Sequence, residues 1–284
     1  MPAAADLLYA ELCSLTSSDD QSDIAKCLVI KCIRLKSSQD DLSEDQRLAL
    51  QRCLMHSDDE VRSAAFAALC HVKKKSSVPS LEELKMIRDF IRLNLAVDSA
   101  AFRQVLISDF TSWLVRLRDC SLSLFRKKTS ENGCKFWLPL VECVNEILLC
   151  LFANVFPGAN YQRLITSLEL LRVMHHCFFN YQPCVGINKA SKSDISDPSA
   201  LVGHVQSCYH LMDFYQKAHM EKLLLATLHY MIDVKSLAGE ILAFFPAPDQ
   251  TAIRAVLKKA LLLACSCKFS ECETAALLFG LCLR

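Results

Sequence analysis

The chain has 284 residues, of which 52% are hydrophobic and 22% are charged. Its formal net charge of +1 excludes a general electrostatic attraction to nucleic acid, so any such contact must come from a local cluster of cations. Only 6 glycines occur, which argues against turn-rich β folds and against glycine-rich phosphate loops.

Apolar residues recur at helical spacing along the chain, in runs separated by short polar breaks. No segment shows the sustained alternation of apolar and polar residues that is typical of strands. The expected helices span 3–16, 22–36, 43–56, 58–74, 80–96, 98–120, 136–155, 159–179, 199–215, 218–233, 235–245, 248–266 and 270–283. The pattern therefore predicts an all-α fold.

The stretch LMHSDDEVRSAAFAALC, residues 54–70, is the most informative about architecture. Asp58 is expected to cap a helix whose apolar face is formed by Val61, Ala64, Ala65, Ala68 and Leu69. This resembles the second helix of a HEAT repeat, in which an arginine at the place of Arg62 often braces an acidic residue of the adjacent unit. The resemblance implies a HEAT/armadillo-type α-solenoid of stacked antiparallel helix pairs.

Two long polar interruptions divide the expected helices, at 125–136 and at 180–200. Loops of that length are commonly functional or disordered. We expect HEAT-like helical repeats over residues 1–180, a loop or linker over 181–198, and further helical repeats that continue the solenoid over 199–284.

Sixteen cysteines are present, and most fall inside apolar helical runs, where a free thiol behaves as a small hydrophobic group. The N-terminal stretch MPAAADLLYAELC lacks the basic region and apolar run of a signal peptide. No run reaches the ~18 apolar residues of a membrane span. These features favour a soluble chain in a reducing compartment, and we expect a cytoplasmic location.

Two clusters of histidine and cysteine invite a metal-site interpretation. Adjacent His175 and His176 point about 100° apart on a helix, so both cannot easily bind one tetrahedral metal ion. Cys265 and Cys267, which precede Cys272, also point in different directions on a helix. We therefore expect structural side chains, no metal and no cofactor. The catalytic and phosphate-loop motifs of common enzyme classes are also missing from the sequence, so we do not expect an enzyme.

Basic residues interleaved with aromatic ones are the better functional lead, because this combination suits a phosphate backbone and unstacked bases. The candidate RNA-binding residues around 116–137 are Arg116, Arg118, Arg126, Lys127 and Lys128, with Phe125, Phe136 and Trp137 nearby. The alternative is a solvated loop whose aromatic residues belong to the core.

A further candidate lies in FPGANYQRLITSLELL, residues 156–171. The Pro-Gly pair predicts a turn between helices, Asn160 a helix cap, and Leu168 and Leu171 a contribution to the core. None of these roles needs a ligand. Arg163 remains, either as a brace between repeats or as a contact for an anionic partner such as RNA.

The same string follows a helix that ends NEILLCLFANV, and the upstream segments FWLPLVECVNEILLCLF and FRQVLISDFTSWLVRLRD accompany it. Together these segments resemble the THADA family, most closely from about residue 40 to 180 of this chain. Family members often carry a second arginine after Gln-Arg, where this chain has Leu164. A two-arginine contact is therefore not expected here.

The resemblance implies a non-catalytic scaffold or regulatory subunit that binds tRNA and supports an FtsJ-type tRNA 2′-O-methyltransferase, which modifies a ribose in the anticodon loop. S-adenosylmethionine would belong to that partner. Family members are far longer than this chain, so we expect a short isoform or a fragment. The alternative is a general protein-interaction HEAT solenoid without nucleic-acid binding.

Overall fold

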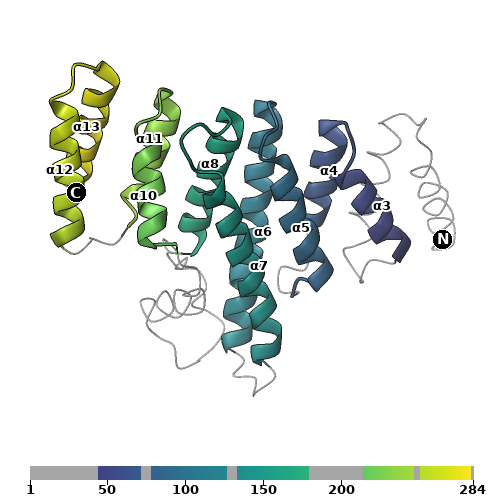
Figure 1. The fold of residues 1–284 in the computed structure, drawn as a ribbon. Coiled ribbons are helices and arrows are strands. Elements are labelled where there is room, and N and C mark those ends of the chain that lie inside the picture. Colours follow the sequence, from purple (N-terminus) through teal and green to yellow (C-terminus); the bar gives the residue numbers. More distant parts are fainter. Residues whose placement is uncertain (1–43, 72–77, 127–132, 179–213, 246–249, 283–284) are drawn as a thin grey trace, which may run out of the picture. The chain divides into compact units, whose positions relative to one another are not determined.

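The computed structural model describes residues 44–71, 78–126, 133–178, 214–245 and 250–282, and within these ranges all regular structure is α-helical (Figure 1). The helices are α3 (Glu44–Leu54), α4 (Asp59–Cys70), α5 (Leu81–Asn94), α6 (Ala100–Arg126), α7 (Gly133–Ala153), α8 (Tyr161–Phe178), α10 (Lys217–Ala226), α11 (Ile232–Leu242), α12 (Gln250–Ala264) and α13 (Phe269–Cys282). The expected all-α fold is confirmed. The expected helices 3–16 and 22–36, and most of 199–215, lie outside the described residues.

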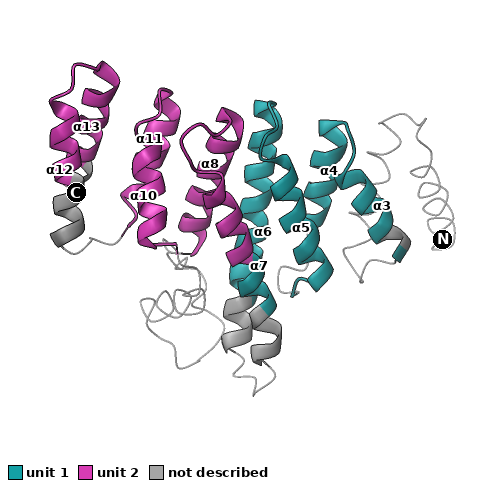
Figure 2. Cartoon of the chain, in the orientation of Figure 1, with its two compact units in different colours: residues 1–143, 188–196 teal, residues 144–187, 197–284 magenta. Residues whose placement is uncertain are grey.

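The chain forms two compact units (Figure 2). Unit 1 comprises residues 1–143 and 188–196, and unit 2 comprises residues 144–187 and 197–284. In unit 1, α4 packs on α3, α5 and α6. In unit 2, α10 packs on α11, α12 packs on α13, and α11 also packs on α8 and α13. Neighbouring helices are thus joined in pairs and stacked on the next pair, which is the arrangement of an α-solenoid. The expected linker at 181–198 lies outside the described residues.

Aromatic and aliphatic side chains form the core of unit 1. Phe66 of α4 stacks on Phe90 of α5, with ring centroids 4.3 Å apart. Phe110 and Trp113 of α6 are fully buried and lie 5.8 Å apart. Since α4 contributes alanines beside these large rings, the neighbouring helices can approach closely.

Side-chain caps begin two helices of unit 1, one of which, at Asp58, the sequence analysis predicted. Asp58 accepts hydrogen bonds from the backbone N–H groups of Glu60 and Val61 at the start of α4. Ser80 accepts from the N–H of Glu83 at 3.2 Å, and Glu83 also hydrogen-bonds the Ser80 backbone, which completes a capping box.

The turn before α8 in unit 2 also forms as predicted. Gly158 has a φ of +85°, a conformation that side-chain-bearing residues rarely adopt. Asn160 accepts from the backbone N–H of Gln162 at 2.9 Å and caps the helix. Leu168 and Leu171 are fully buried. The proposed roles of this turn, cap and core face are confirmed.

The predicted helices at 218–233 and 235–245 are wrong in their shared boundary. α10 ends at Ala226, and α11 begins at Ile232. The break contains no glycine or proline, so the sequence carries no ordinary turn signal at this position. Side chains make it instead: the hydroxyl of Thr227 donates to the Leu224 carbonyl at 2.7 Å, and the His229 Nδ1 accepts from the Met231 N–H at 3.1 Å.

Candidate functional site

Arg116, one of the predicted RNA contacts, is buried between two helices of unit 1. Only 5% of it is exposed, and its guanidinium donates to both carboxylate oxygens of Glu83 at 2.6 and 3.3 Å. Burial raises the pKa of Glu83, and the charge of Arg116 opposes that shift. The pair joins α6 to α5 and leaves Arg116 almost no surface for a phosphate. We therefore correct the prediction: Arg116 is positioned as a brace.

The rest of the predicted basic cluster is described only in part. Arg118 is mostly buried, and its guanidinium pairs with the adjacent Asp119 at 3.0 Å. Arg126 is the last residue of α6, but its side chain lies outside the described residues, as do Lys127 and Lys128. An RNA-contact role for Arg118, Arg126, Lys127 and Lys128 stays a prediction.

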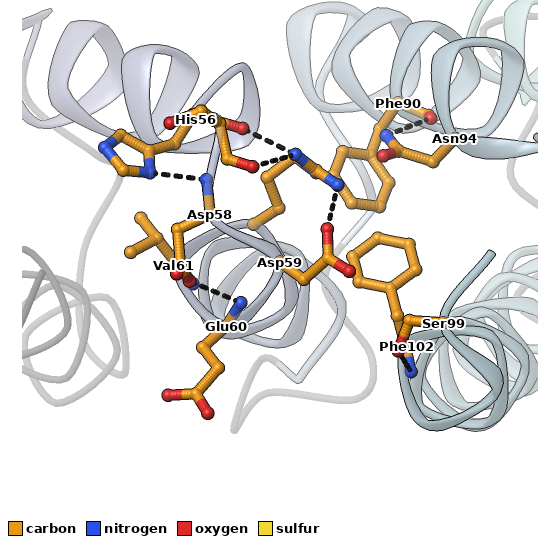
Figure 3. Close-up of polar contacts among 11 residues, drawn as sticks. His56, Asp58, Asp59, Glu60, Val61, Phe90, Asn94, Ser99 and Phe102 are labelled. Atoms are coloured by element: carbon orange, nitrogen blue, oxygen red, sulfur yellow. Dashed lines mark hydrogen bonds and ion pairs between the residues drawn. The ribbon is translucent and has the colours of Figure 1, made fainter. Parts of the chain in front are cut away.

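Arg62 braces helices in a way that differs from the HEAT pattern (Figure 3). Within the described residues, its carboxylate partner is Asp59 of the same helix, not an acid of the adjacent pair. Its guanidinium also donates to the carbonyls of His56 and Ser57 at 2.7 and 2.9 Å, which fixes the α3–α4 turn. The contact with the next pair is made over the ring of Phe102, 5.3 Å from the centroid.

Arg163 lies in the first turn of α8 and is exposed. Its backbone N–H points to the Asn160 side chain at 3.4 Å. Across the part of the chain that the structure describes, its guanidinium forms no ion pair or hydrogen bond. A bracing carboxylate is therefore not among the described residues, and the anion-contact role of Arg163 stays a prediction.

A groove of about 770 Å³ lies between α3 and α5 in unit 1. Its lining residues are Glu44, Arg47, Leu48, Gln51, Leu54, Met55, Glu82, Lys85, Met86, Asp89, Phe90, Arg92 and Leu93. The three acids and three bases in this lining balance, and Arg47 pairs with Glu82. A groove whose charges balance and whose lining includes several apolar residues suits a segment of a protein better than a polyanion.

The sequence analysis missed this groove, although a signal for it was present. Leu48, Met55 and Leu93 are exposed apolar residues that fall outside the buried faces of α3 and α5. A single helix face can bury only part of the apolar residues of these helices, so the surplus apolar residues were the signal for an exposed groove.

His175, considered above as a metal ligand, lies in an aromatic cluster of unit 2. Its ring stacks on Phe244 with centroids 4.1 Å apart, and its Nε2 lies 2.7 Å from the Tyr215 hydroxyl. Burial, with a smaller effect from His176, lowers the pKa of His175 to about 4. Burial also raises the pKa of Tyr215 to about 12. The pair is thus neutral at physiological pH and holds α8 to the residues before α10.

Within the described ranges, no group of three or more histidine, cysteine or acidic side chains could hold a metal ion. No helix within the same ranges is long and apolar enough to cross a membrane.

The model of a family described as "Trm732, TPR repeats" matches residues 9–192. Curated relatives include the protein named tRNA (32-2′-O)-methyltransferase regulator THADA of Mus musculus, 25% identical over 249 residues, which are 81% of this chain and 12% of the relative. Proteins of the same name from Canis lupus familiaris and Homo sapiens are each 23% identical, over 81% and 85% of this chain and 12% of each relative. The chain thus spans about an eighth of these relatives. No solved structure matches it.

Proposed function

Because the chain belongs to the Trm732 family of helical-repeat proteins, we propose that it is a non-catalytic regulatory subunit in the 2′-O-methylation of tRNA. The observation that carries the proposal is the family match over 9–192, together with relatives whose name makes them regulators of such a methyltransferase. We further propose a partner of the FtsJ type, tRNA binding by this chain, modification in the anticodon loop and a cytoplasmic location.

A helical-repeat scaffold can serve this reaction without chemistry of its own. Holding two reactants in a productive orientation lowers the barrier of a bimolecular step, because the loss of translational and rotational freedom is paid on binding. The scaffold needs one surface for the enzyme and one for the tRNA, whereas the methyl donor binds to the enzyme. The exposed Arg163 guanidinium is a described cation available to a tRNA phosphate.

Purification of the tagged chain from cells, with and without ribonuclease, tests this proposal. We expect a 2′-O-methyltransferase and tRNA to co-purify with the untreated chain, and the methyltransferase to remain in part after nuclease treatment. The purified chain should also bind tRNA with an affinity that falls as salt rises. Absence of both the enzyme and tRNA from the untreated sample would contradict the proposal.

The groove between α3 and α5 favours a second candidate function, a protein-interaction solenoid that does not bind nucleic acid. Met55→Glu with Leu93→Glu would place charges on exposed apolar positions of the groove without disturbing the core. If this candidate is right, the double variant loses its protein partners while tRNA never appears in the purified sample. Loss of the methyltransferase alone, with tRNA retained, would instead assign the groove to the regulatory complex.

A further inference from the structure

Three turns of unit 2 each present an exposed aromatic side chain. Phe156 lies in the α7–α8 turn and is 49% exposed, Tyr230 in the α10–α11 turn at 77%, and Phe269 at the start of α13 at 82%. Within the described residues these are the most exposed rings of unit 2, although burial of an aromatic ring is favourable. Their repeated position suggests a common role.

Contacts between α8 and α11 show that their turns lie side by side. The hydroxyl of Tyr161, the first residue of α8, lies 3.5 Å from Asp233, the second residue of α11. Further along, Arg172 of α8 pairs with Glu240 of α11 at 3.3 Å. The two helices therefore run parallel, with their N-terminal ends together.

The same relation holds between α11 and α13. The buried Lys235 of α11 donates to the Ser270 carbonyl and to Glu273 near the start of α13, at 3.0 and 2.8 Å. Gly239, one turn later, packs so closely on Leu277 that a Cβ there would lie 2.6 Å from its Cδ2. The turns before α8, α11 and α13 consequently follow one another along one edge of the magenta unit in Figure 2.

Cations accompany the aromatic residues on this turn edge. Arg163 is exposed beside the first turn, and Lys268, 76% of whose side chain is exposed, immediately precedes Phe269. The carboxylates of Asp233 and Glu271 near the edge already contact Tyr161 and Lys268. Arg163 thus supplies a positive charge that no described carboxylate neutralises.

One of the rings is also held in place. The imidazole of His229 stacks on Tyr230 with centroids 4.4 Å apart, while its own Nδ1 accepts the Met231 N–H. A ring fixed in this way loses little rotamer freedom when a ligand stacks on its open face. Tyr230 is thus packed against His229 while most of its surface remains exposed.

We propose that this turn edge, formed by Phe156, Arg163, Tyr230, Lys268 and Phe269, binds an unpaired stretch of RNA by stacking about one base on each ring. Packed helices lie about 8–10 Å apart, so rings on successive turns are expected to offer separate stacking positions. Helical-repeat RNA readers use the same register of one base per repeat. A protein partner would favour a continuous apolar core instead. The proposal rests on the proposed function and names the surface that would meet the tRNA.

The test compares the full chain with a variant in which Phe156, Tyr230 and Phe269 are all replaced by serine. The probes are an unstructured 12-nucleotide RNA and a blunt RNA duplex of the same length. We expect the variant to bind the single strand at least tenfold more weakly, because stacking contributes about 1–3 kcal/mol per base. Binding to the duplex should be nearly unchanged, since its bases are already stacked.

A matched control replaces Leu225, Leu261 and Leu262, exposed apolar residues of α10 and α12 in the same unit, by serine. This control should bind the single strand like the wild type, and Tyr230→Phe should retain most of the affinity. Thermal unfolding of every variant shows whether the fold survives. Equal loss in the control triple, or full single-strand affinity in the aromatic triple, would overturn the proposal.

The outcome for the turn edge can be separated from that for the proposed function. If wild-type chain co-purifies with methyltransferase and tRNA while the aromatic triple variant binds RNA normally, only the turn edge is wrong. If the single strand depends on the three rings but no methyltransferase is found, the turn edge stands and the proposed function fails. If the three rings are needed to capture a protein and the single strand does not bind, the ligand of the turn edge is that protein and not RNA. This result would overturn the inference.

Discussion

Arg116 and Arg163 look alike in the sequence but lie in opposite environments. Arg116 is 5% exposed and paired with Glu83, whereas Arg163 is exposed and has no described ion-pair partner. Composition and helical spacing gave no way to separate them, because each arginine sits on a helix beside apolar residues. Only the packing of α5 against α6 shows that Arg116 is buried in an ion pair.

Replacement of Arg163 by alanine should change the free energy of unfolding by no more than about 0.5 kcal/mol, as is usual for exposed sites. The same change should weaken tRNA binding and reduce the salt slope of the affinity by about one, because one phosphate contact is lost. Arg172→Ala on the same helix, which breaks an ion pair with Glu240, is the matched control. A large loss of stability with unchanged tRNA affinity would restore the bracing role.

His175 should make the stability of the chain depend on pH. The unfolded chain takes up a proton on this residue near its ordinary pKa of 6.5, whereas the folded chain does so only near 4. Between these values the unfolded state binds more protons, so the free energy of unfolding falls as the pH falls. At pH 4 the loss from this residue is about 3 kcal/mol relative to pH 7.

Urea unfolding at several pH values checks this dependence. His175→Gln, which keeps a hydrogen-bonding group toward Tyr215, should show a flatter decline between pH 6.5 and 4 than the wild type. Parallel declines in the two proteins would mean that His175 titrates normally in the folded state.

At the scale of the helix, caps and faces were predictable and side-chain-made breaks were not. Asp58 and Asn160 were expected as caps, and each accepts a hydrogen bond from a backbone N–H group in the first turn of its helix. The turn after Ala226 was missed because Thr227 and His229 create it through their own hydrogen bonds. Such contacts depend on which carbonyl or N–H is within reach, which periodicity does not reveal.

Alanine substitutions at two glycines can test whether backbone conformation, with no crowding of the added side chain, lowers the stability of the chain. At Gly158 and at Gly280 an added Cβ would meet nothing within 4 Å, but only Gly158 has a positive φ, of +85°. Gly158→Ala should therefore destabilise the chain by about 1 kcal/mol. Gly280→Ala, within α13, should be neutral or stabilising by up to about 1 kcal/mol. Thermal unfolding of both variants checks this, and equal effects would show that the α7–α8 turn tolerates a side chain.

The Arg116–Glu83 pair should stabilise the contact of α6 with α5 only while both partners are present. Arg116→Met would leave a buried carboxylate without its cation and cost about 3–5 kcal/mol. Adding Glu83→Leu should recover most of that loss, since a buried ion pair and an apolar pair of similar volume are often equivalent. Denaturant unfolding of the two single variants and the double variant measures the coupling. Additive losses would show that the two residues act independently.

At the scale of the molecule, the sequence predicted the all-α repeat architecture and the family resemblance that the comparisons support. The candidate surfaces were harder to predict from the sequence. The groove between α3 and α5 and the turn edge of unit 2 are built from residues far apart in the chain, and helix packing alone brings them together. Arg163 was identified from the sequence, whereas Phe156, Tyr230 and Phe269 were not, because the exposure of an aromatic residue at a turn is decided by its neighbours.

The most direct measurement of the central proposal is the rate at which the partner methyltransferase methylates the ribose 2′-hydroxyl of tRNA, with and without this chain. The proposal predicts a several-fold higher rate, or a lower tRNA concentration for half-maximal rate, when the chain is added. The Arg163→Ala variant should give a smaller increase than Arg172→Ala. An unchanged rate and an unchanged tRNA dependence, with folded chain and active enzyme both present, would contradict the proposed regulatory role.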